Sequence, residues 1–252
     1  MFVKVISHKQ KDLNLNIMNN RKKIVVFSGA GLDAESGIPT FRDCVNGLWH
    51  NYKIEEVATL DAWKKTPEKV LAFYNDRRKA LDSVQPNNAH KALAKLEENF
   101  NVINVTQNVS DLLERGGSTN VLHLHGELRK MRGTFSNKFL YDCTEDIKMG
   151  DKCPRGSQLR PHLVLFGEYP YNVDEAYYAL RRADYVLVIG TGFDISYTAG
   201  MVATCNPKAK VIYIDPNPSP ALQGWGLDLT YVKSKAAEGV PEVVNKIMNN
   251  EI

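Results

Sequence analysis

Four short apolar runs rich in β-branched residues divide the chain, and each ends in a polar or glycine-rich segment. The runs are Ile24 to Phe27, Val102 to Val105, Tyr185 to Ile189 and Val211 to Ile214. Strands that are apolar on both faces are typical of a parallel sheet that helices cover on both sides. The pattern therefore predicts the central strands of an α/β domain.

Three stretches with helical spacing separate these strands. Thr66 and Pro67 predict the start of the first helix, because proline suits the first helical position. Helices are also expected over residues 88–98 and 174–182. The positions expected to line the first two helices are Val70, Phe73, Tyr74, Arg77 and Leu81, then Ala89, Leu93 and Leu96. This alternation predicts a doubly wound, Rossmann-like parallel sheet.

Periodicity fails between Gly126 and Arg160, where glycine and proline interrupt the pattern. We interpret residues 126–160 as a small module inserted into a nucleotide-binding domain of residues 21–125 and 161–252. A helical part of the small domain is expected within residues 44–85. Residues 1–20 show no sustained period and are predicted to be a loosely attached extension.

Composition narrows the function classes. The 252 residues include 32 Lys+Arg and 29 Asp+Glu, a net charge of +3 that gives no reason to expect a nucleic-acid or membrane partner. Apolar runs are far shorter than the roughly 20 residues of a membrane span, and the polar start differs from a secretory signal. Four cysteines in a chain of this length do not form a disulfide framework, so a cytoplasmic location is expected. The sequence specifies no oligomeric state.

A glycine-rich loop follows the first predicted strand. Ser28 to Ala34 fits the pattern G-x-G-x-x-G/A, in which glycines let the backbone approach a pyrophosphate at a helix N-terminus. A purely structural turn is the alternative. The stretch from Ser36 to Asp43 contains too many turn-forming residues for an ordinary crossover helix.

Three further polar segments leave the predicted strands at the same edge, where open α/β sheets bind ligands. They are Thr106 to Asp111, Gly190 to Gly192 and Asp215 to Asn217. Nearby, His123 and His125 would share one face of an extended strand. Three interpretations stay open at this point: structural histidines, a two-histidine metal site, or one general base.

A set of ordered motifs spans most of the chain: Gly29-Ala30-Gly31, Ser36 to Arg42, Gly47-Leu48-Trp49, Thr106-Gln107-Asn108, His125-Gly126, Phe166-Gly167-Glu168 and Gly190-Thr191. In this order they resemble the sirtuins, the NAD-dependent protein deacylases, over roughly residues 22–245. The likeness is greatest to the bacterial class III sirtuins.

The resemblance implies NAD as co-substrate, acylated-lysine proteins as partners, and nicotinamide and O-acyl-ADP-ribose as products. It implies His125 as the catalytic base and Asn108 as a second catalytic residue. It also implies a substrate-pairing strand at Phe166, Gly167 and Glu168. The implied NAD-binding residues are Gly29, Ala30, Gly31, Phe41, Arg42, Gln107, Asn108, Val109, Ser110, Gly190, Thr191, Gly192, Asp215, Asn217 and Ala236.

Tyr74 and Arg77 refine the expected substrate. Their i, i+3 spacing places a phenol and a guanidinium on one helix face. Sirtuins with Tyr-x-x-Arg here prefer succinyl- or malonyl-lysine, and a guanidinium can hold a carboxylate through two hydrogen bonds. The alternative is a solvated arginine on a helix surface.

The sequence departs from the family at three positions of the implied NAD site. Asp33 stands where sirtuins usually have serine, and its carboxylate would repel a pyrophosphate unless turned away or paired. Ser110 replaces an aspartate that normally contacts nicotinamide, and Gly192 replaces a serine. Weaker NAD binding or slower turnover is the expectation.

The expected structural zinc is a fourth departure. Sirtuins usually carry two pairs of cysteines in the inserted module, but here Gly133 stands at the first position, and only Cys143 and Cys153 remain. No structural zinc is therefore expected. The function predicted is removal of succinyl or malonyl, and of acetyl, from lysine. The alternatives are an NAD hydrolase or ADP-ribosyltransferase, and a non-catalytic module that binds NAD or acyl-lysine.

Overall fold

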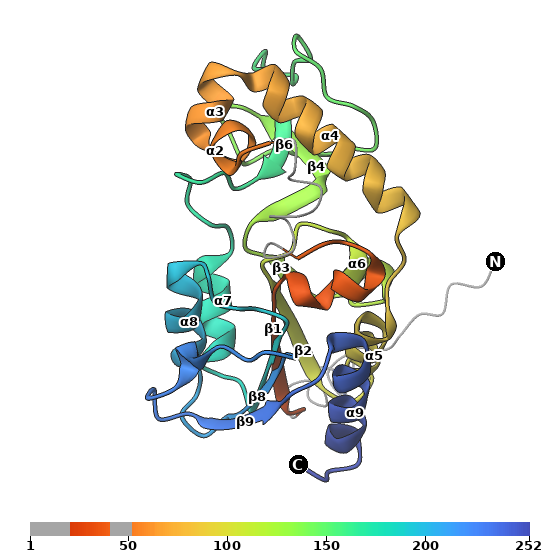
Figure 1. Cartoon of the computed structure of the whole chain (residues 1–252), viewed down its shortest axis with the longest axis vertical. Coiled ribbons are helices and arrows are strands. Elements are labelled where there is room, and N and C mark those ends of the chain that lie inside the picture. Colours follow the sequence, from red (N-terminus) through yellow and green to blue (C-terminus); the bar gives the residue numbers. More distant parts are fainter. Residues whose placement is uncertain (1–20, 41–51) are drawn as a thin grey trace, which may run out of the picture.

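The computed structural model describes residues 21–40 and 52–252 (Figure 1). Its main sheet contains β1 (Lys23–Ser28), β2 (Asn101–Thr106), β3 (Val121–His123), β7 (Tyr185–Ile189), β8 (Lys210–Ile214) and β9 (Asp228–Val232). These six strands are all parallel and follow the order β3-β2-β1-β7-β8-β9. The predicted doubly wound α/β class is confirmed.

The four predicted strands are the four inner strands of this sheet, and the two strands that were missed are its edges. β3 has only three residues, and the residues of β9 are all half-buried or exposed. An edge strand has one neighbour and much less burial, so it does not require a continuous apolar run. The apolar pattern therefore identifies only the centre of the sheet.

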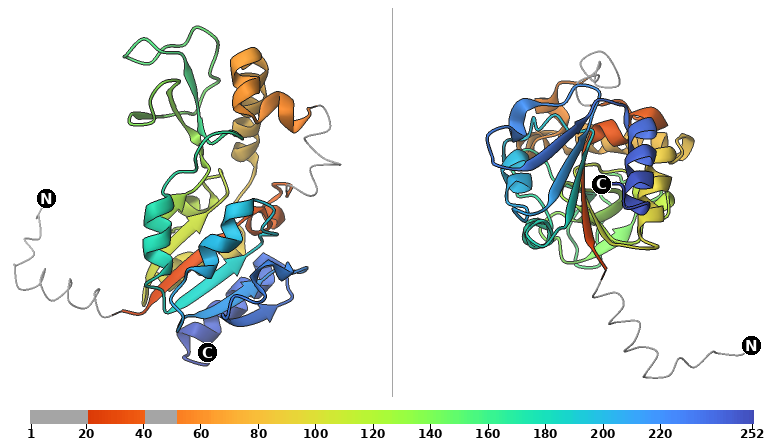
Figure 2. Two further views of the ribbon diagram at one scale, coloured as in Figure 1. Left: turned by 90° about the vertical axis from the view of Figure 1, so that its left-hand side faces the viewer. Right: turned by 90° about the horizontal axis from the view of Figure 1, so that it is seen from below.

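Successive residues of β1 enter two separate cores. Ile24 and Val26 pack with α5 (Asn88–Leu96) and α9 (Ala236–Met248), whereas Val25 and Phe27 pack with α7 (Val173–Leu180) and α8 (Ser196–Ala203). Figure 2 shows the sheet between these two helical layers. This alternation explains why every residue of the run had to be apolar.

A small second sheet lies at one end of the main sheet (Figures 1 and 2). It contains β4 (Gly126–Gly133), β5 (Leu140–Asp142) and β6 (Leu159–Leu163) in the antiparallel order β5-β4-β6. Beside it lie α2 (Ile54–Val57), α3 (Leu60–Lys65) and α4 (Pro67–Ser83).

Strands at residues 126–160 were not predicted, because the alternation that would reveal them is broken. The pairing of β4 with β6 shifts register between Glu127 and Met131, and β5 is largely exposed. Such an irregularity interrupts the period of two along a strand. β6 also crosses residue 160, the predicted end of the inserted module, so the domain limits remain an interpretation of the sequence.

Helix α4 begins as predicted, with Thr66 at its N-cap and Pro67 in its first turn. The burial of Arg78 was not predicted. Its Nε donates to the carbonyl of Leu128, 2.7 Å away, and its Nη1 donates to Oδ1 of Asn75 at 2.8 Å. The first bond joins α4 to β4, whereas the second lies within α4 and holds the guanidinium in place on the helix that carries Tyr74.

The glycine-rich loop differs from its prediction. Two 3₁₀ turns, Ala30–Leu32 and Ala34–Ser36, follow β1 where the start of a longer helix was expected. The prediction of a helix N-terminus facing a phosphate is therefore wrong for the described residues, since a turn of three residues aligns few peptide dipoles. A separate prediction concerned membrane spans: among residues 21–40 and 52–252, the structure contains no helix with the length and apolar composition of one.

Candidate active site

The strand order reverses at β1, because the chain moves from β1 out to β3 and then returns to β7 on the other side of β1. Ligands of open α/β sheets bind at such a switch point, beyond the carboxyl ends of the strands. The predicted segments after β1, β2 and β7 meet there. Gln107 Nε2 donates to Thr191 Oγ1 at 3.0 Å, and Asn108 Nδ2 donates to the carbonyl of Gly29 at 3.0 Å.

Glycines let the main chains of two of these segments touch. The Gly31 N–H donates to the Gly190 carbonyl at 2.8 Å, and a Cβ on Gly31 would lie 2.6 Å from the Gly190 Cα. Gly190 itself has φ +57°, in the left-handed region. The glycines therefore have a structural role, because they permit this close contact between two loops. That role is compatible with a nucleotide bound at the same edge of the sheet.

Asn108 is held by its backbone as well as by its amide. Its N–H donates to Thr106 Oγ1 at 3.0 Å, and its carbonyl oxygen lies 2.8 Å from Nδ1 of His123. Val109, the next residue, accepts a backbone hydrogen bond from Leu128 of the small sheet. The loop after β2 is thus fixed from both sheets.

His125 has hydrogen-bond partners at both ring nitrogens. Nδ1 lies 3.0 Å from the carbonyl oxygen of Gln107, and Nε2 lies 2.9 Å from the hydroxyl of Tyr197. Because a carbonyl oxygen can only accept, Nδ1 carries the proton of the neutral ring and the lone pair is on Nε2. Burial lowers the pKa of His125, and the hydrogen bond to Gln107 opposes this only in part. The site therefore contains a neutral imidazole with one defined proton-accepting nitrogen.

His123 has a different environment. Its Nε2 lies 2.9 Å from Glu114, and burial, which lowers its pKa, is outweighed by the hydrogen bond and charge of that carboxylate. The pKa of His123 is raised, so the protonated ring donates to both Glu114 and Asn108. Ligand atoms of Glu114, His123 and Glu127 lie within 4.8 Å of one another, but His125 is not in this group. The two histidines therefore do not form a shared metal site, and His123 has a structural role.

Asp33 and Ser110, two of the departures from the family, are hydrogen-bonded to each other. Ser110 Oγ donates to Asp33 Oδ2 at 2.7 Å, and His90 Nε2 lies 3.1 Å from Oδ1. His90 Nδ1 accepts from the backbone N–H of Asn87, so Nε2 is the donor to Asp33. The Asp33 side chain is only 5% exposed. Its carboxylate is therefore both paired and turned into the protein.

The more distant residues of the implied nucleotide site follow β8 and begin α9. The N–H of Asn217 donates to Asp215 Oδ1 at 2.8 Å, which forms a tight turn after β8. Ala236 is buried at the start of α9, and the N–H of the next residue, Ala237, donates to Glu35 at 2.7 Å. Gly192 follows Thr191 at the same sheet edge and is half-buried. Phe41 and Arg42 lie outside the described residues.

Tyr74 and Arg77 share one aromatic neighbour on α4. The Arg77 guanidinium lies 4.6 Å from the Phe73 ring centroid, and the Tyr74 ring meets the same ring edge-on at 4.9 Å. Burial raises the pKa of Tyr74, while the charges of Arg160 and Arg77 offset part of this effect. The phenol therefore stays protonated as a donor, with positive charge close by.

The predicted substrate strand is already hydrogen-bonded along one side. The N–H of Phe166 donates to Ala58 at 2.8 Å, and its carbonyl accepts from Leu60 at 3.0 Å, while the Phe166 side chain remains exposed. Gly167 follows with φ +99°. The Glu168 carboxylate accepts two hydrogen bonds from Arg160, at 2.9 and 3.0 Å. The Glu168 side chain thus stabilises the small module.

The two remaining cysteines of the module lie in different surroundings. Cys143 is buried in the cluster that includes Trp63 and Leu71, whereas Cys153 Sγ lies 3.2 Å from Ser157 Oγ. Burial raises the pKa of Cys143, which disfavours the thiolate that zinc requires. In the part of the chain that the structure describes, neither thiol belongs to a group of three metal-ligating side chains.

Purified, untagged protein is therefore expected to contain well under one zinc per chain, measured by inductively coupled plasma mass spectrometry. Dialysis against a chelator is expected to leave the melting temperature unchanged, because neither thiol belongs to a group of metal-ligating side chains among the described residues. One equivalent of zinc that survives dialysis would contradict this expectation.

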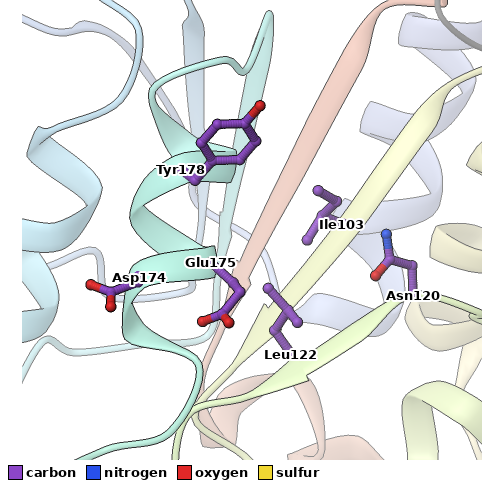
Figure 3. A pocket seen from close by; sticks show the side chains of 6 residues that line it. All are labelled: Ile103, Asn120, Leu122, Asp174, Glu175 and Tyr178. Atoms are coloured by element: carbon purple, nitrogen blue, oxygen red, sulfur yellow. The ribbon is translucent and has the colours of Figure 1, made fainter.

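A shallow pocket elsewhere does not contribute to the site. Figure 3 shows its lining by β2, β3 and α7, and none of the side chains in it belongs to the predicted site. These residues are Ile103, Asn120, Leu122, Asp174, Glu175 and Tyr178. The candidate active site is thus defined by the switch point and not by this depression.

Tyr197 contacts the predicted base, and the sequence did not reveal this residue. It occupies the second position of the eight-residue helix α8, and no motif or periodicity marks it. Its contact with His125 joins positions 72 residues apart in the chain. Only the folded arrangement could show it.

Comparison with known proteins agrees with this geometry. The family model described as the Sir2 family matches residues 29–196. A relative from Aggregatibacter actinomycetemcomitans is 47% identical over 80% of this chain and 98% of its own length. Another, from Bacteroides thetaiotaomicron, is 41% identical over 88% of this chain and 96% of its own length. Both are named NAD-dependent protein deacylase.

Solved structures show the same fold. A variant of a Sir2 homologue in complex with ADP-ribose is 36% identical, with a TM-score of 0.81 and coverage of 98% of both chains. A Sir2 homologue in complex with NAD is 37% identical, with a TM-score of 0.78 over 97% of this chain and 96% of its own.

Proposed function

Because this chain belongs to the Sir2 family, the sirtuins, we propose that it is an NAD-dependent protein deacylase that prefers succinyl- or malonyl-lysine. The observation that carries the catalytic part is His125, a partly buried neutral imidazole whose Nδ1 is held by the Gln107 carbonyl, so that Nε2 is its proton-accepting nitrogen. A base of this kind suits proton abstraction near neutral pH. The acyl preference rests on Tyr74 and Arg77.

The residues at the switch point fit NAD. Because Gly29, Gly31 and Gly190 have no side chains, the loops pack closely against each other at the sheet edge. A Cβ at Gly31 would clash with main-chain atoms there. The Asp33 carboxylate is turned into the protein, where both of its oxygens accept hydrogen bonds, and this orientation supports a pyrophosphate at the loop. The side chains proposed to hold the co-substrate are those of Gln107, Asn108, Ser110, Thr191, Asp215 and Asn217, with Phe41 and Arg42 outside the described residues.

When bound, NAD supplies a ribose carbon that the acyl oxygen can attack as nicotinamide leaves. The protein then needs a group that accepts a proton from a ribose hydroxyl, and His125 Nε2 is the proposed acceptor. Gln107 holds the ring through Nδ1, so it defines which nitrogen is basic. Asn108 is held by Gly29 and His123 and is proposed to position the ribose.

The acyl preference follows from charge. A succinyl or malonyl group carries a carboxylate, which a guanidinium binds through charge-assisted hydrogen bonds. The Arg77 guanidinium and the Tyr74 ring both contact Phe73. They therefore supply the cation and the phenolic donor that recognition of a carboxylate requires. The protonated state of Tyr74 is favoured by burial.

We expect Arg77→Ala to lower kcat/KM for a succinyl-lysine peptide by roughly 10- to 100-fold, since charge-assisted hydrogen bonds contribute about 1.5–3 kcal/mol. NAD-dependent deacylation of the matching acetyl-lysine peptide is expected to change little. Lys79→Ala is the matched control, because Lys79 is an exposed cation on the same helix that pairs with Asp146. An unchanged ratio of succinyl to acetyl activity in Arg77→Ala would exclude the proposed role of Arg77.

The decisive test of the activity incubates the protein with NAD and succinyl-, malonyl- and acetyl-lysine peptides, followed by mass spectrometry. Loss of the acyl mass together with nicotinamide release is the expected result. Nicotinamide release without any acyl peptide would indicate an NAD hydrolase or ADP-ribosyltransferase instead. Binding without turnover would indicate a non-catalytic module.

A further inference from the structure

The proton-accepting nitrogen of His125 is covered by another side chain. Tyr197 Oη lies 2.9 Å from His125 Nε2, and the two rings meet edge to face with centroids 6.4 Å apart. The donor and acceptor can be assigned, because Nδ1 of the neutral ring uses its proton on the Gln107 carbonyl. Tyr197 must therefore donate its hydroxyl hydrogen to the lone pair of Nε2.

The hydroxyl is a stable donor in this position. Burial raises the pKa of Tyr197 to about 12, with a further contribution from nearby Tyr177. Burial also lowers the pKa of His125, and no charged side chain among the described residues contributes to that change. Near neutral pH the pair consists of a protonated phenol and an unprotonated imidazole nitrogen.

The segment before Tyr197 has a constrained backbone. Phe193 has φ +59°, which is unusual for a bulky residue, and its N–H donates to Thr191 Oγ1 at 3.3 Å. Its ring stacks on Phe27 with centroids 6.3 Å apart. The same loop that leaves β7 at the switch point thus delivers Tyr197 to the base, five residues after Gly192.

We propose that Tyr197 is a positioning residue that covers the proton-accepting nitrogen of His125, so that the base accepts a proton from a substrate hydroxyl only after the tyrosine has released it. Nε2 has one lone pair and cannot accept from both hydroxyls at once. In the step itself, the substrate O–H bond breaks and its proton forms the Nε2–H bond. The tyrosine keeps its own proton and turns to another acceptor. This inference rests on the proposed function, because it assigns His125 the role of base.

Tyr197→Phe removes the hydroxyl and keeps the ring, so it tests the proposal directly. The lost hydrogen bond exists only with the neutral form of His125. Its loss is therefore expected to raise the pKa of His125 by about half to one pH unit. The acidic limb of the kcat/KM profile should shift to higher pH by the same amount. At a pH above this limb, kcat/KM is expected to rise about three- to tenfold, because no hydrogen bond has to be released first.

The pKa is measured without turnover, by nuclear magnetic resonance of protein labelled at histidine, with the His125 signals assigned from their absence in His125→Gln. Tyr178→Phe is the matched control, since it removes an exposed phenol hydroxyl from α7. If the wild-type protein shows no deacylation, the proposed function fails while the titration still tests the contact. An unchanged pKa of His125 in Tyr197→Phe would overturn the proposal. So would a loss of kcat, which would show that the phenol relays the proton instead of covering the base.

Discussion

Replacing His125 with alanine is expected to lower kcat/KM for NAD-dependent deacylation by roughly 10²- to 10⁴-fold, the usual contribution of a positioned general base. At the switch point it is the histidine whose accepting nitrogen is defined, through Gln107, while His123 uses both nitrogens as donors to Asn108 and Glu114. The measurement is steady-state, NAD-dependent deacylation of a succinyl-lysine peptide followed by mass spectrometry. Activity within tenfold of the wild type would exclude His125 as the base.

The fold of the variant has to be checked separately, because His125 is largely buried and its removal leaves the Gln107 carbonyl without this donor. A cost of about 1–3 kcal/mol in the free energy of unfolding is expected, and urea denaturation measures it. His8→Ala, which changes a histidine outside the described residues, serves as the control for activity.

The pH dependence of the wild-type enzyme follows from the same residue. The base is active when neutral, and burial lowers the pKa of His125 below its ordinary value of about 6.5. Activity should therefore persist at pH 6.5 and decline only as the pH falls further, through the pKa of the folded protein.

The sequence predicted the fold best at positions where a single requirement, such as burial on both faces of the sheet, restricts the residue type. β1 and β7 lie between two helical layers, so each residue of the runs Ile24 to Phe27 and Tyr185 to Ile189 had to be apolar and the runs could be recognised. The glycines at 29, 31 and 190 were visible because the main chains touch there. The edge strand β3 was missed because it has only three residues, and β9 because its exposed positions permit polar residues.

Hydrogen bonds between side chains and groups distant in the sequence could not be predicted from any local pattern. The burial of Arg78 depends on carbonyl groups that only the folded β4 and its neighbouring loop provide. Likewise, Asp33 and Ser110 each looked like a separate defect of the nucleotide site, although they lie 77 positions apart and share a hydrogen bond. Their role depends on the hydrogen bond between them, which the spacing of residues in the sequence cannot predict.

Ser110→Ala is expected to lower the free energy of unfolding by about 1.5–3 kcal/mol, because it leaves the buried Asp33 carboxylate with His90 as its remaining side-chain donor. Ser110→Asp is expected to destabilise the protein further, since two carboxylates would then lie together in a buried place. Urea denaturation near neutral pH measures both effects. Ser83→Ala removes an exposed hydroxyl that bonds to Ala80 and should change stability by less than about 0.5 kcal/mol.

The exchange of both residues gives the sharpest result. In Asp33→Ser combined with Ser110→Asp, one hydroxyl and one carboxylate again face each other, so the double variant is expected to recover most of the stability that Ser110→Asp loses. The coupling energy from the complete cycle should be about 1–3 kcal/mol, within the range for residues in one hydrogen-bond network. Additive effects of the two substitutions would mean that the contact contributes nothing. A measurable coupling would show instead that the two departures compensate each other: the pair still combines one carboxylate with one hydroxyl, but the carboxylate belongs to residue 33 and the hydroxyl to residue 110.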